Sequence, residues 1–376
     1  MPQHKNQHYV PQFLLRNFSN NTKNINLYNF KSDDFKKQVP IKGQCSEDYF
    51  YGKGKKTEEG LGSIEDFISP IIKELNLKAK EISSLLTFVS LQTFRTKYYV
   101  DMAIEIANNT AKEIISNNYE FRETSGHEDL VIDIKARRDV LAKKNIQNAI
   151  MALPLLQDLK CKVLINENSG SFIISDNPCV LYNLCFHNLE QGSNIALLSK
   201  GLMIILPISA KKSIIFYDNK CYKIGDKKAS MVKIKAEDVA ELNKLQILNA
   251  DENIYFLDNN EHELQMQIKR LLVIKNNDKI ENIKIKDDNN GNIVCRGRRL
   301  PIKYRPDLSF CKILSKKEYT KNFGDRDENL RPLHNDFRKK VDEKKYRPDE
   351  WIKYIKDKNA FYASALTEIE RGSFFV

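Results

Sequence analysis

The sequence predicts an α+β fold in which a helical layer packs on a mostly antiparallel sheet, with a basic C-terminal extension of mixed structure. Two observations predict this class. Residues 80–118 and 135–152 place apolar side chains three and four positions apart, as a helix with one buried face does. Residues 162–217 instead contain short apolar runs separated by turn residues, which is typical of strands. With 376 residues and 41% hydrophobic composition, the chain can bury one large core or two smaller ones.

The first elements follow from local signals. The segment PQFLLRNF predicts a short helix that begins at Pro11, where the missing N–H costs nothing. Residues 25–30, INLYNF, alternate in polarity and predict a strand. A helix is expected in SIEDFISPIIKEL, with Ser63 and Asp66 at the spacing of a capping box and with Pro70 kinking or restarting it.

The later segments predict strands and then helices. KVLIN and SFIIS are expected to form two strands joined by a tight turn at ENSG, and GLMIILPIS and KSIIFYD form a second pair connected through Lys211 and Lys212. AEDVAELNKLQILN is expected to be a helix, and QMQIKRLLVIK a further helix or a buried strand. Asp, Asn and Gly gather at residues 285–295, which predicts a boundary between a core domain, 1–285, and the extension, 286–376.

Composition limits the location and the class of protein. No stretch approaches the roughly 18 consecutive apolar residues that span a bilayer, and the start MPQHKNQH lacks the apolar core of a signal peptide. We therefore expect no membrane partner and a cytoplasmic location. The seven cysteines are an odd number without a CxxC pair, so reduced thiols are expected rather than a zinc site. A P-loop, a Rossmann glycine fingerprint and a GxSxG elbow are absent, which argues against motors, dehydrogenases and esterases of the usual kinds.

The net charge of +11 has two explanations. A compositionally biased genome produces abundant Lys, Asn and Ile together, and the charges are then only solvated surface. Alternatively, the charges bind nucleic acid. Residues 276–376 carry 24 Lys and Arg against 17 Asp and Glu, a net charge of +7, and interleaved aromatic residues suit base stacking. The candidate nucleic-acid contacts in this region are Arg296, Arg298 and Arg299.

The long central helix contains a polar face. Gln92 and Arg95 lie three apart in LQTFRT and share a side of the helix, together with Thr96. Apolar residues fill the preceding turns, and a lone buried guanidinium would be too costly. Arg95 is therefore either paired with a buried carboxylate or directed at an anionic ligand.

A candidate partner lies in SFIISDNP, where Asp176 follows a predicted strand. Asn177 and Pro178 force the chain to turn, so the Asp176 carboxylate stands at a strand end, where sites are often built. Asp176 either accepts backbone N–H bonds within the turn, or it serves as a metal ligand, a general base or the counter-ion of Arg95.

The segment HYVPQFLLRNF places a histidine directly before the first helix. Residues before a proline are kept out of the helical region, so His8 is expected in an extended arm and cannot form a helical metal pair with His4. His8 is then either a hydrogen-bonding residue or an acid–base group at the helix start, where backbone N–H dipoles favour an anion. Gln12 and Arg16, four apart on the following helix, add a polar face beside it.

Five blocks together resemble a bacterial family of domains of unknown function, whose members open with an HxVPQxxLxxF motif and carry an SDNP turn. The blocks are HYVPQFLLRNFS, LQTFRT, FIISDNP, LPIS and LNKLQILNADENIYF, in this order over residues 4–275. Members of that family occur in phage-defence gene neighbourhoods, so the resemblance implies a host-protective role but no settled activity. The positions to which it points are His8, Tyr9, Gln12, Arg16, Gln92, Arg95, Asp176, Asn177 and Pro178.

Two functions fit these residues. The first is an effector that hydrolyses nucleic acid or nucleotides, in which Asp176 holds a divalent metal ion or orients water, His8 acts as acid or base, and Arg95 steadies phosphate charge. Glu65 and Glu128 are further carboxylate candidates by chemical type alone. The second is a non-catalytic sensor whose basic region binds nucleic acid or a phage component. The enzyme requires His8, Arg95 and Asp176 to converge on one cleft, whereas the sensor does not.

Overall fold

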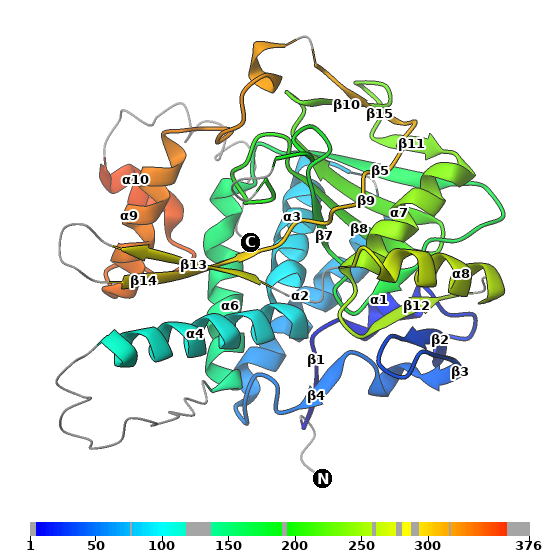
Figure 1. Ribbon diagram of the computed structural model, residues 1–376, viewed down its shortest axis with the longest axis horizontal. Coiled ribbons are helices and arrows are strands. Elements are labelled where there is room, and N and C mark those ends of the chain that lie inside the picture. Colours follow the sequence, from blue (N-terminus) through cyan, green and yellow to red (C-terminus); the bar gives the residue numbers. More distant parts are fainter. Residues whose placement is uncertain are drawn as a thin grey trace.

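A computed structural model describes residues 5–75, 77–117, 137–189, 194–257, 261–275, 280–286, 293–315 and 317–358. Its elements form an α+β structure with mostly antiparallel sheets (Figure 1), which confirms the predicted fold class. Helices α2, α3, α4 and α6 pack together as one group, and α7 and α8 lie toward the opposite side of the molecule in this view. No helix within the ranges just given is long and apolar enough to cross a membrane.

The N-terminal arm forms a strand before its helix. β1 (Asn6–His8) pairs antiparallel with β4 (Ser46–Asp48), so the predicted extended arm is confirmed. Pro11 has φ −60° and ψ 139°, and the predicted helix forms as α1 (Gln12–Arg16), which begins one residue after the predicted start. Because the proline ring holds φ near this value, Pro11 fixes the turn from strand to helix.

The predicted start of the second helix is wrong. The helix α2 begins eight residues before Ser63, so Ser63 and Asp66 lie inside it and form no capping box. The Ser63 hydroxyl instead donates to the backbone carbonyl of Glu59 at 3.0 Å. Pro70 also lies within α2 and does not restart it. The helices of this group are α2 (Lys55–Glu74), α3 (Ala79–Phe94), α4 (Lys97–Asn117) and α6 (Arg138–Ala152), followed by the 3-10 turn η2 (Leu153–Leu155).

The predicted continuous helix over residues 80–118 is also wrong, because the chain breaks at Arg95 and Thr96. Both side chains bond to other parts of the molecule. Arg95 turns toward α2, and the Thr96 hydroxyl donates to Asn177 Oδ1 at 3.2 Å. These are tertiary contacts, and the apolar periodicity of the helix contains no information about them.

Two sheets carry most of the strands. The larger has the order β11-β5-β9-β8-β7 and the smaller β3-β2-β12-β6; β5 and β11 run parallel, and the other neighbours in these two sheets run antiparallel. The bounds are β2 (Asn24–Asn29), β3 (Asp34–Pro40), β5 (Lys160–Asn166), β6 (Ile174–Ser175), β7 (Val180–Tyr182), β8 (Met203–Ser209), β9 (Lys212–Tyr217), β11 (Met231–Ile234) and β12 (Asn253–Phe256), with the 3-10 turn η1 (Ile41–Gly43) after β3.

One of the two predicted strand pairs is confirmed. β8 and β9 form the expected antiparallel pair. The predicted hairpin of KVLIN with SFIIS is wrong, because β5 pairs with β9 and β11 while β6 pairs with β12. Residues 171–175 are buried throughout, so this segment pairs inside the core rather than with its neighbour in sequence. The predicted helix after residue 235 is α7 (Ala236–Asn249), and QMQIKRLLVIK contributes to α8 (Glu261–Leu272).

The main hydrophobic core joins the sheets to the helices. Leu14 of α1, Leu85 of α3, Ile205 of β8 and Leu245 of α7 all belong to one buried cluster. A separate cluster centred on Phe337 lies between α9 and α10 and includes Met151 from the end of α6.

The chain after residue 286 returns to the preceding part at several places. Tyr304 Oη donates to Glu241 Oε2 at 2.5 Å, and Arg326 Nε donates to Asp158 Oδ2 at 2.8 Å. The strand β10 (Tyr222–Ile224) pairs antiparallel with β15. A domain boundary near residue 285 stays a prediction. The elements of this part are β13 (Ile280–Lys286), β14 (Ile293–Arg299), β15 (Cys311–Ile313), the 3-10 turn η3 (Glu318–Thr320), α9 (Leu330–Asp342) and α10 (Trp351–Lys358).

Candidate functional site

Asp176 is held by backbone donors from a distant part of the chain. Its Oδ1 accepts the N–H of Asp251 at 2.8 Å, and its Oδ2 accepts the N–H groups of Glu252 at 2.7 Å and Asn253 at 2.9 Å. The side chain is only 3% exposed. Burial, and then the charge of Asp251, raise the pKa of Asp176 to about 6, although the three N–H bonds act in the opposite direction. The carboxylate therefore fixes the start of β12 against the end of β6.

The rest of the SDNP turn is bonded to the end of α7. Asn177 Nδ2 donates to the carbonyl of Asn249 at 3.0 Å, and Asn249 Nδ2 donates back to the carbonyl of Asn177. Gln246 Nε2 donates to the carbonyl of Pro178 at 2.7 Å, and its Oε1 accepts the Ser175 hydroxyl at 2.8 Å. Each of these groups is buried. Reciprocal side-chain hydrogen bonds of this kind satisfy the polar groups of a turn that is shielded from water.

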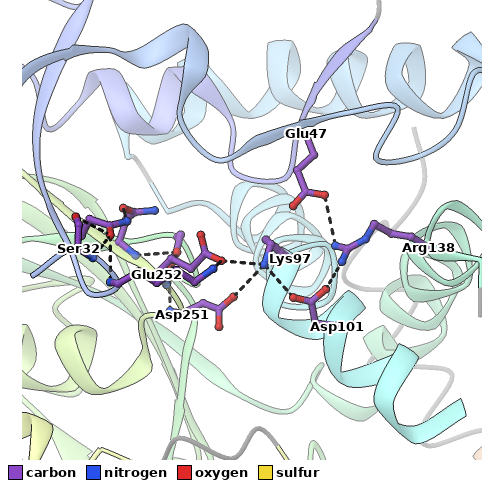
Figure 2. Close-up of polar contacts among 11 residues, drawn as sticks. Ser32, Glu47, Lys97, Asp101, Arg138, Asp251 and Glu252 are labelled. Atoms are coloured by element: carbon purple, nitrogen blue, oxygen red, sulfur yellow. Dashed lines mark hydrogen bonds and ion pairs between the residues drawn. The ribbon is translucent and has the colours of Figure 1, made fainter. Parts of the chain in front are cut away.

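A half-buried network of charges continues outward from this turn (Figure 2). Lys97 Nζ lies 3.0 Å from Asp101 Oδ2, 3.0 Å from Glu252 Oε1 and 3.9 Å from Asp251 Oδ2. Burial disfavours the charged form of Lys97, but these carboxylates outweigh burial and raise its pKa. Arg138 extends the network to β4. Its Nη2 lies 2.7 Å from Asp101 Oδ1, and its Nη1 lies 3.4 Å from Glu47 Oε2.

Arg95 is paired with Glu65 and not with Asp176. Its Nη2 lies 2.8 Å from Glu65 Oε1, and its Nε donates to Gln92 Oε1 at 2.9 Å. Gln92 Nε2 in turn donates to the backbone carbonyl of Tyr9 at 3.0 Å. Arg95 is 2% exposed, whereas 24% of the Glu65 side chain reaches solvent. The proposal that Asp176 is the counter-ion of Arg95 is therefore wrong, and a carboxylate 30 residues earlier in the chain takes that role.

A second carboxylate lies on the same face of α2. Glu58 and Glu65 are seven residues apart, which is two helical turns, so they project from one side. Burial, and then the charge of Glu65, raise the pKa of Glu58 to about 6, although the charge of Arg95 opposes this. Glu58 Oε2 is buried and has no hydrogen-bond partner among the described residues. The side chain is therefore held in an environment that favours its protonated form.

His8 of β1 lies within electrostatic range of Arg95. Its Nε2 lies 3.1 Å from the carbonyl of Lys42, and the Tyr51 hydroxyl donates to the His8 carbonyl at 3.4 Å. Burial lowers the pKa of His8; the Lys42 contact opposes this shift, and the charges of Arg95 and Arg16 reinforce it. A neutral His8 that donates through Nε2 leaves Nδ1 as its basic nitrogen. We call His8, Glu58, Glu65, Gln92 and Arg95 the Arg95 cluster.

The predicted site residues thus divide between two groups. His8, Gln92 and Arg95 belong to the Arg95 cluster, and Asp176 and Asn177 belong to the SDNP turn. Tyr9 lies between the groups, because its carbonyl binds Gln92 while burial and nearby charges, that of Asp176 included, raise the pKa of its hydroxyl. Convergence of all three predicted catalytic side chains on one cleft stays a prediction. On α1, the exposed Arg16 donates to Gln12 Oε1 at 3.0 Å.

Arg299, a predicted nucleic-acid contact, bonds within the protein. Its Nη1 donates to the Tyr99 hydroxyl at 2.7 Å, and its Nη2 donates to Asn249 Oδ1. The guanidinium carbon lies 5.2 Å from the ring centre of Tyr98 and 5.3 Å from that of Tyr99. These contacts tie β14 to α4 and to the end of α7. The side chains of Arg296 and Arg298 lie outside the described residues, as does Glu128.

A metal ligand was one of the roles considered for Asp176, with Glu65 and Glu128 as further carboxylate candidates. In the described part of the chain, no three His, Cys, Asp or Glu side chains lie close enough together to hold a metal ion. Both oxygens of Asp176 are instead occupied by backbone N–H groups.

The sequence analysis did not identify Glu58, and it named Glu65 as a candidate by chemical type alone. The available signal was their seven-residue spacing in a segment that is helical, because this spacing places two acids on one face. A helix start predicted at Ser63 instead of Lys55 left Glu58 outside the helix and hid the spacing.

We expect Glu58→Gln to stabilise the protein more at pH 8 than at pH 5. The raised pKa means that the contribution of Glu58 to stability is complete below its usual pKa of 4.5 and is lost as pH rises through about 6. Glutamine does not titrate, so the stability difference from the wild type should grow by about 1 kcal/mol over this range, a value reduced for partial exposure. Urea denaturation at several pH values measures it. Glu59→Gln, on the exposed side of α2, is the control, and a difference independent of pH would contradict the shift.

Comparison with known proteins identifies a family but no activity. No curated protein and no solved structure matches the chain. Residues 6–260 match a family described as "Protein of unknown function (DUF4238)", and this range includes the arm with His8, Glu58 and Glu65 of α2, Arg95 and the SDNP turn. The match covers most of the chain, so the protein belongs to the DUF4238 family.

Proposed function

We propose that the protein is a cytoplasmic anti-phage defence effector that hydrolyses nucleic acid or nucleotides at the Arg95 cluster. One observation carries the chemical part of this proposal. Glu58 and Glu65 lie on one face of α2 in different surroundings: Glu65 forms an ion pair with Arg95 at 2.8 Å, whereas burial raises the pKa of Glu58 to about 6. A carboxylic acid whose pKa is raised toward neutrality can donate a proton as a general acid. The defence role is supported by the resemblance of the HYVPQ and SDNP blocks.

The cluster offers a role for each side chain. His8, neutral because its pKa is lowered, accepts a proton from water through Nδ1 as the water oxygen attacks phosphorus. The bond from phosphorus to the leaving oxygen breaks, and Glu58 supplies the proton that this oxygen needs. Solvent then returns a proton from His8 to Glu58. Arg95 forms an ion pair with Glu65 and adds positive potential at the cluster, and the net charge of +11 favours anionic substrates.

A second function is favoured by a specific observation. The Arg95–Glu65 pair is complete without a ligand, since Arg95 is 2% exposed and already donates to both Glu65 and Gln92. A chain in which these residues only stabilise the core would be a non-catalytic sensor or a nucleic-acid-binding module of a defence system. The two functions differ in whether Glu58 is needed beyond folding.

Glu58→Gln is expected to abolish phage protection in cells while the protein stays soluble and its denaturation midpoint is unchanged or higher. The substitution keeps the shape of the side chain but removes the proton donor, and loss of such a group typically lowers the rate by about 10²–10⁴-fold. Efficiency of plating and release of nucleotides from a mixed RNA and DNA substrate measure the effect. For the wild type, hydrolysis should fall about tenfold per pH unit above pH 6, as Glu58 loses its proton.

Glu59→Gln is the matched control for this test. It carries the same chemical change one residue away, on the exposed side of α2, and should protect as well as the wild type. Full protection by Glu58→Gln would overturn the hydrolase and leave the sensor as the function of this cluster.

A further inference from the structure

A cavity lined by lysines lies away from the Arg95 cluster. It has a volume of about 390 Å³ and is bounded by β10, β11, β15 and the start of α7. These strands lie at the upper edge of the view in Figure 1, far from α2 and β1. Four of its nine lining residues are lysines, and one is acidic. The residues are Lys223, Gly225, Val232, Lys233, Lys235, Asp238, Ser309, Phe310 and Lys312.

Two of the lysines oppose each other across paired strands. Lys223 and Lys312 are direct partners in the antiparallel pair of β10 and β15, and both occupy the exposed face of that pair. Like charges in this position are destabilising. No ion pair with either side chain, or with Lys235, forms in the described part of the chain, and Lys233 pairs only with the exposed Glu167, at 3.0 Å. Among the described residues, therefore, Glu167 is the one ion-pair partner of the four cavity lysines.

The acid of the cavity is already engaged. Asp238 accepts the backbone N–H of Lys235 at 3.0 Å, the backbone N–H of Ser309 at 2.6 Å and the Ser309 hydroxyl at 2.8 Å. These bonds close the start of α7 and the turn before β15, so the carboxylate shapes the cavity and forms no ion pair with its lysines. The cavity also has an apolar wall, which Phe310 and Val232 provide.

We propose that this cavity binds a nucleoside phosphate, with the phosphate groups on Lys223, Lys312 and Lys235 and the base against Phe310. Lysine ammonium groups bind phosphate as point charges, and an aromatic face stacks on a base. The volume lies in the range of small-molecule sites, which suits one nucleotide better than a strand of nucleic acid. A bound phosphate would also relieve the repulsion between Lys223 and Lys312. The site is separate from the proposed catalytic cluster, and it holds whether or not that cluster is an enzyme.

Calorimetry on the full chain in physiological salt tests the proposal. The ligands are the four ribonucleoside triphosphates, inorganic triphosphate and a single-stranded oligonucleotide, and the affinity of each is measured. At least one nucleotide is expected to bind more tightly than inorganic triphosphate, because the base adds a contact. The double variant Lys223→Gln and Lys312→Gln should weaken nucleotide binding at least tenfold. It should also fold, with a denaturation midpoint at or above that of the wild type, because a like-charge pair is removed.

The double variant Lys23→Gln and Lys36→Gln is the matched control. It removes the same charge from two exposed positions, one just before β2 and one in β3. These strands lie far from β10, β11 and β15 in Figure 1, so the control should bind like the wild type. If the cavity double variant does not fold, Lys312→Gln alone carries the test. Three results would overturn the proposal: no nucleotide binds, the control loses as much affinity as the cavity variant, or the oligonucleotide binds at these lysines while nucleotides do not.

Discussion

Replacing Asp176 with asparagine is expected to lower the free energy of unfolding by about 3 kcal/mol. In the wild type, both carboxylate oxygens accept backbone N–H groups, one on Oδ1 and two on Oδ2. Asparagine has one oxygen and one NH₂ group, so at least one of the three N–H donors would face another donor in a site that is 3% exposed. The change also removes charge-assisted bonds, each worth about 1.5–3 kcal/mol, and leaves a buried donor unpaired. Urea denaturation at pH 7.5, where Asp176 is ionised, measures the loss.

Asp34→Asn provides the control for this substitution. Asp34 lies exposed at the start of β3, and the same chemical change there should alter stability by no more than about 0.5 kcal/mol. The expected loss of protection with Asp176→Asn then follows from loss of folded protein. A variant with the wild-type denaturation midpoint but no phage protection would contradict this explanation and would give the Asp176 charge a direct part in activity.

The sequence predicted the elements whose causes are local. Pro11 sets the start of α1 through its own ring, and β8 and β9 are adjacent in sequence and in the sheet. The pattern of residues 80–118 also identified helical structure, but it could not place the break at Arg95 and Thr96. That break depends on Glu65 and Asn177, which are 30 and 81 residues away along the chain.

The sequence identified several polar residues of the candidate site, but it did not identify the groups to which they bond. The polar side chains His8, Arg95 and Asp176 were found because they interrupt apolar patterns. Their partners come from segments that no spacing connects to them. Asp176 accepts N–H groups at least 75 residues further along the chain. The buried segment SFIIS likewise pairs, through β6, with the distant strand β12. Backbone donors have no signature in the sequence at all, which is why an Asx turn, a metal site and a catalytic carboxylate could not be separated.

Breaking the Arg95–Glu65 pair from either side is expected to destabilise the protein by about 3 kcal/mol, because one partner is left without its counter-charge. Glu65→Gln leaves a guanidinium that is 2% exposed. Arg95→Met also removes the donor to Gln92, whose amide holds the carbonyl of Tyr9. The double variant Arg95→Met and Glu65→Met buries no charge and should recover at least about 2 kcal/mol relative to the sum of the single losses.

Phage protection by this double variant decides what the pair is for. The exposed pair of Lys321 and Glu318 is the control, because side chains that are 59% and 77% exposed should contribute less than about 1 kcal/mol when both are replaced by methionine. If the Arg95 cluster is catalytic, the double variant regains stability but gives no protection, since Met supplies neither the carboxylate nor the positive charge. If the cluster only stabilises the core, protection returns together with stability. A double variant that is no more stable than the sum of the single losses would show that Arg95 and Glu65 are not coupled in the folded protein, and the role proposed for their ion pair in the Arg95 cluster would lose its structural basis.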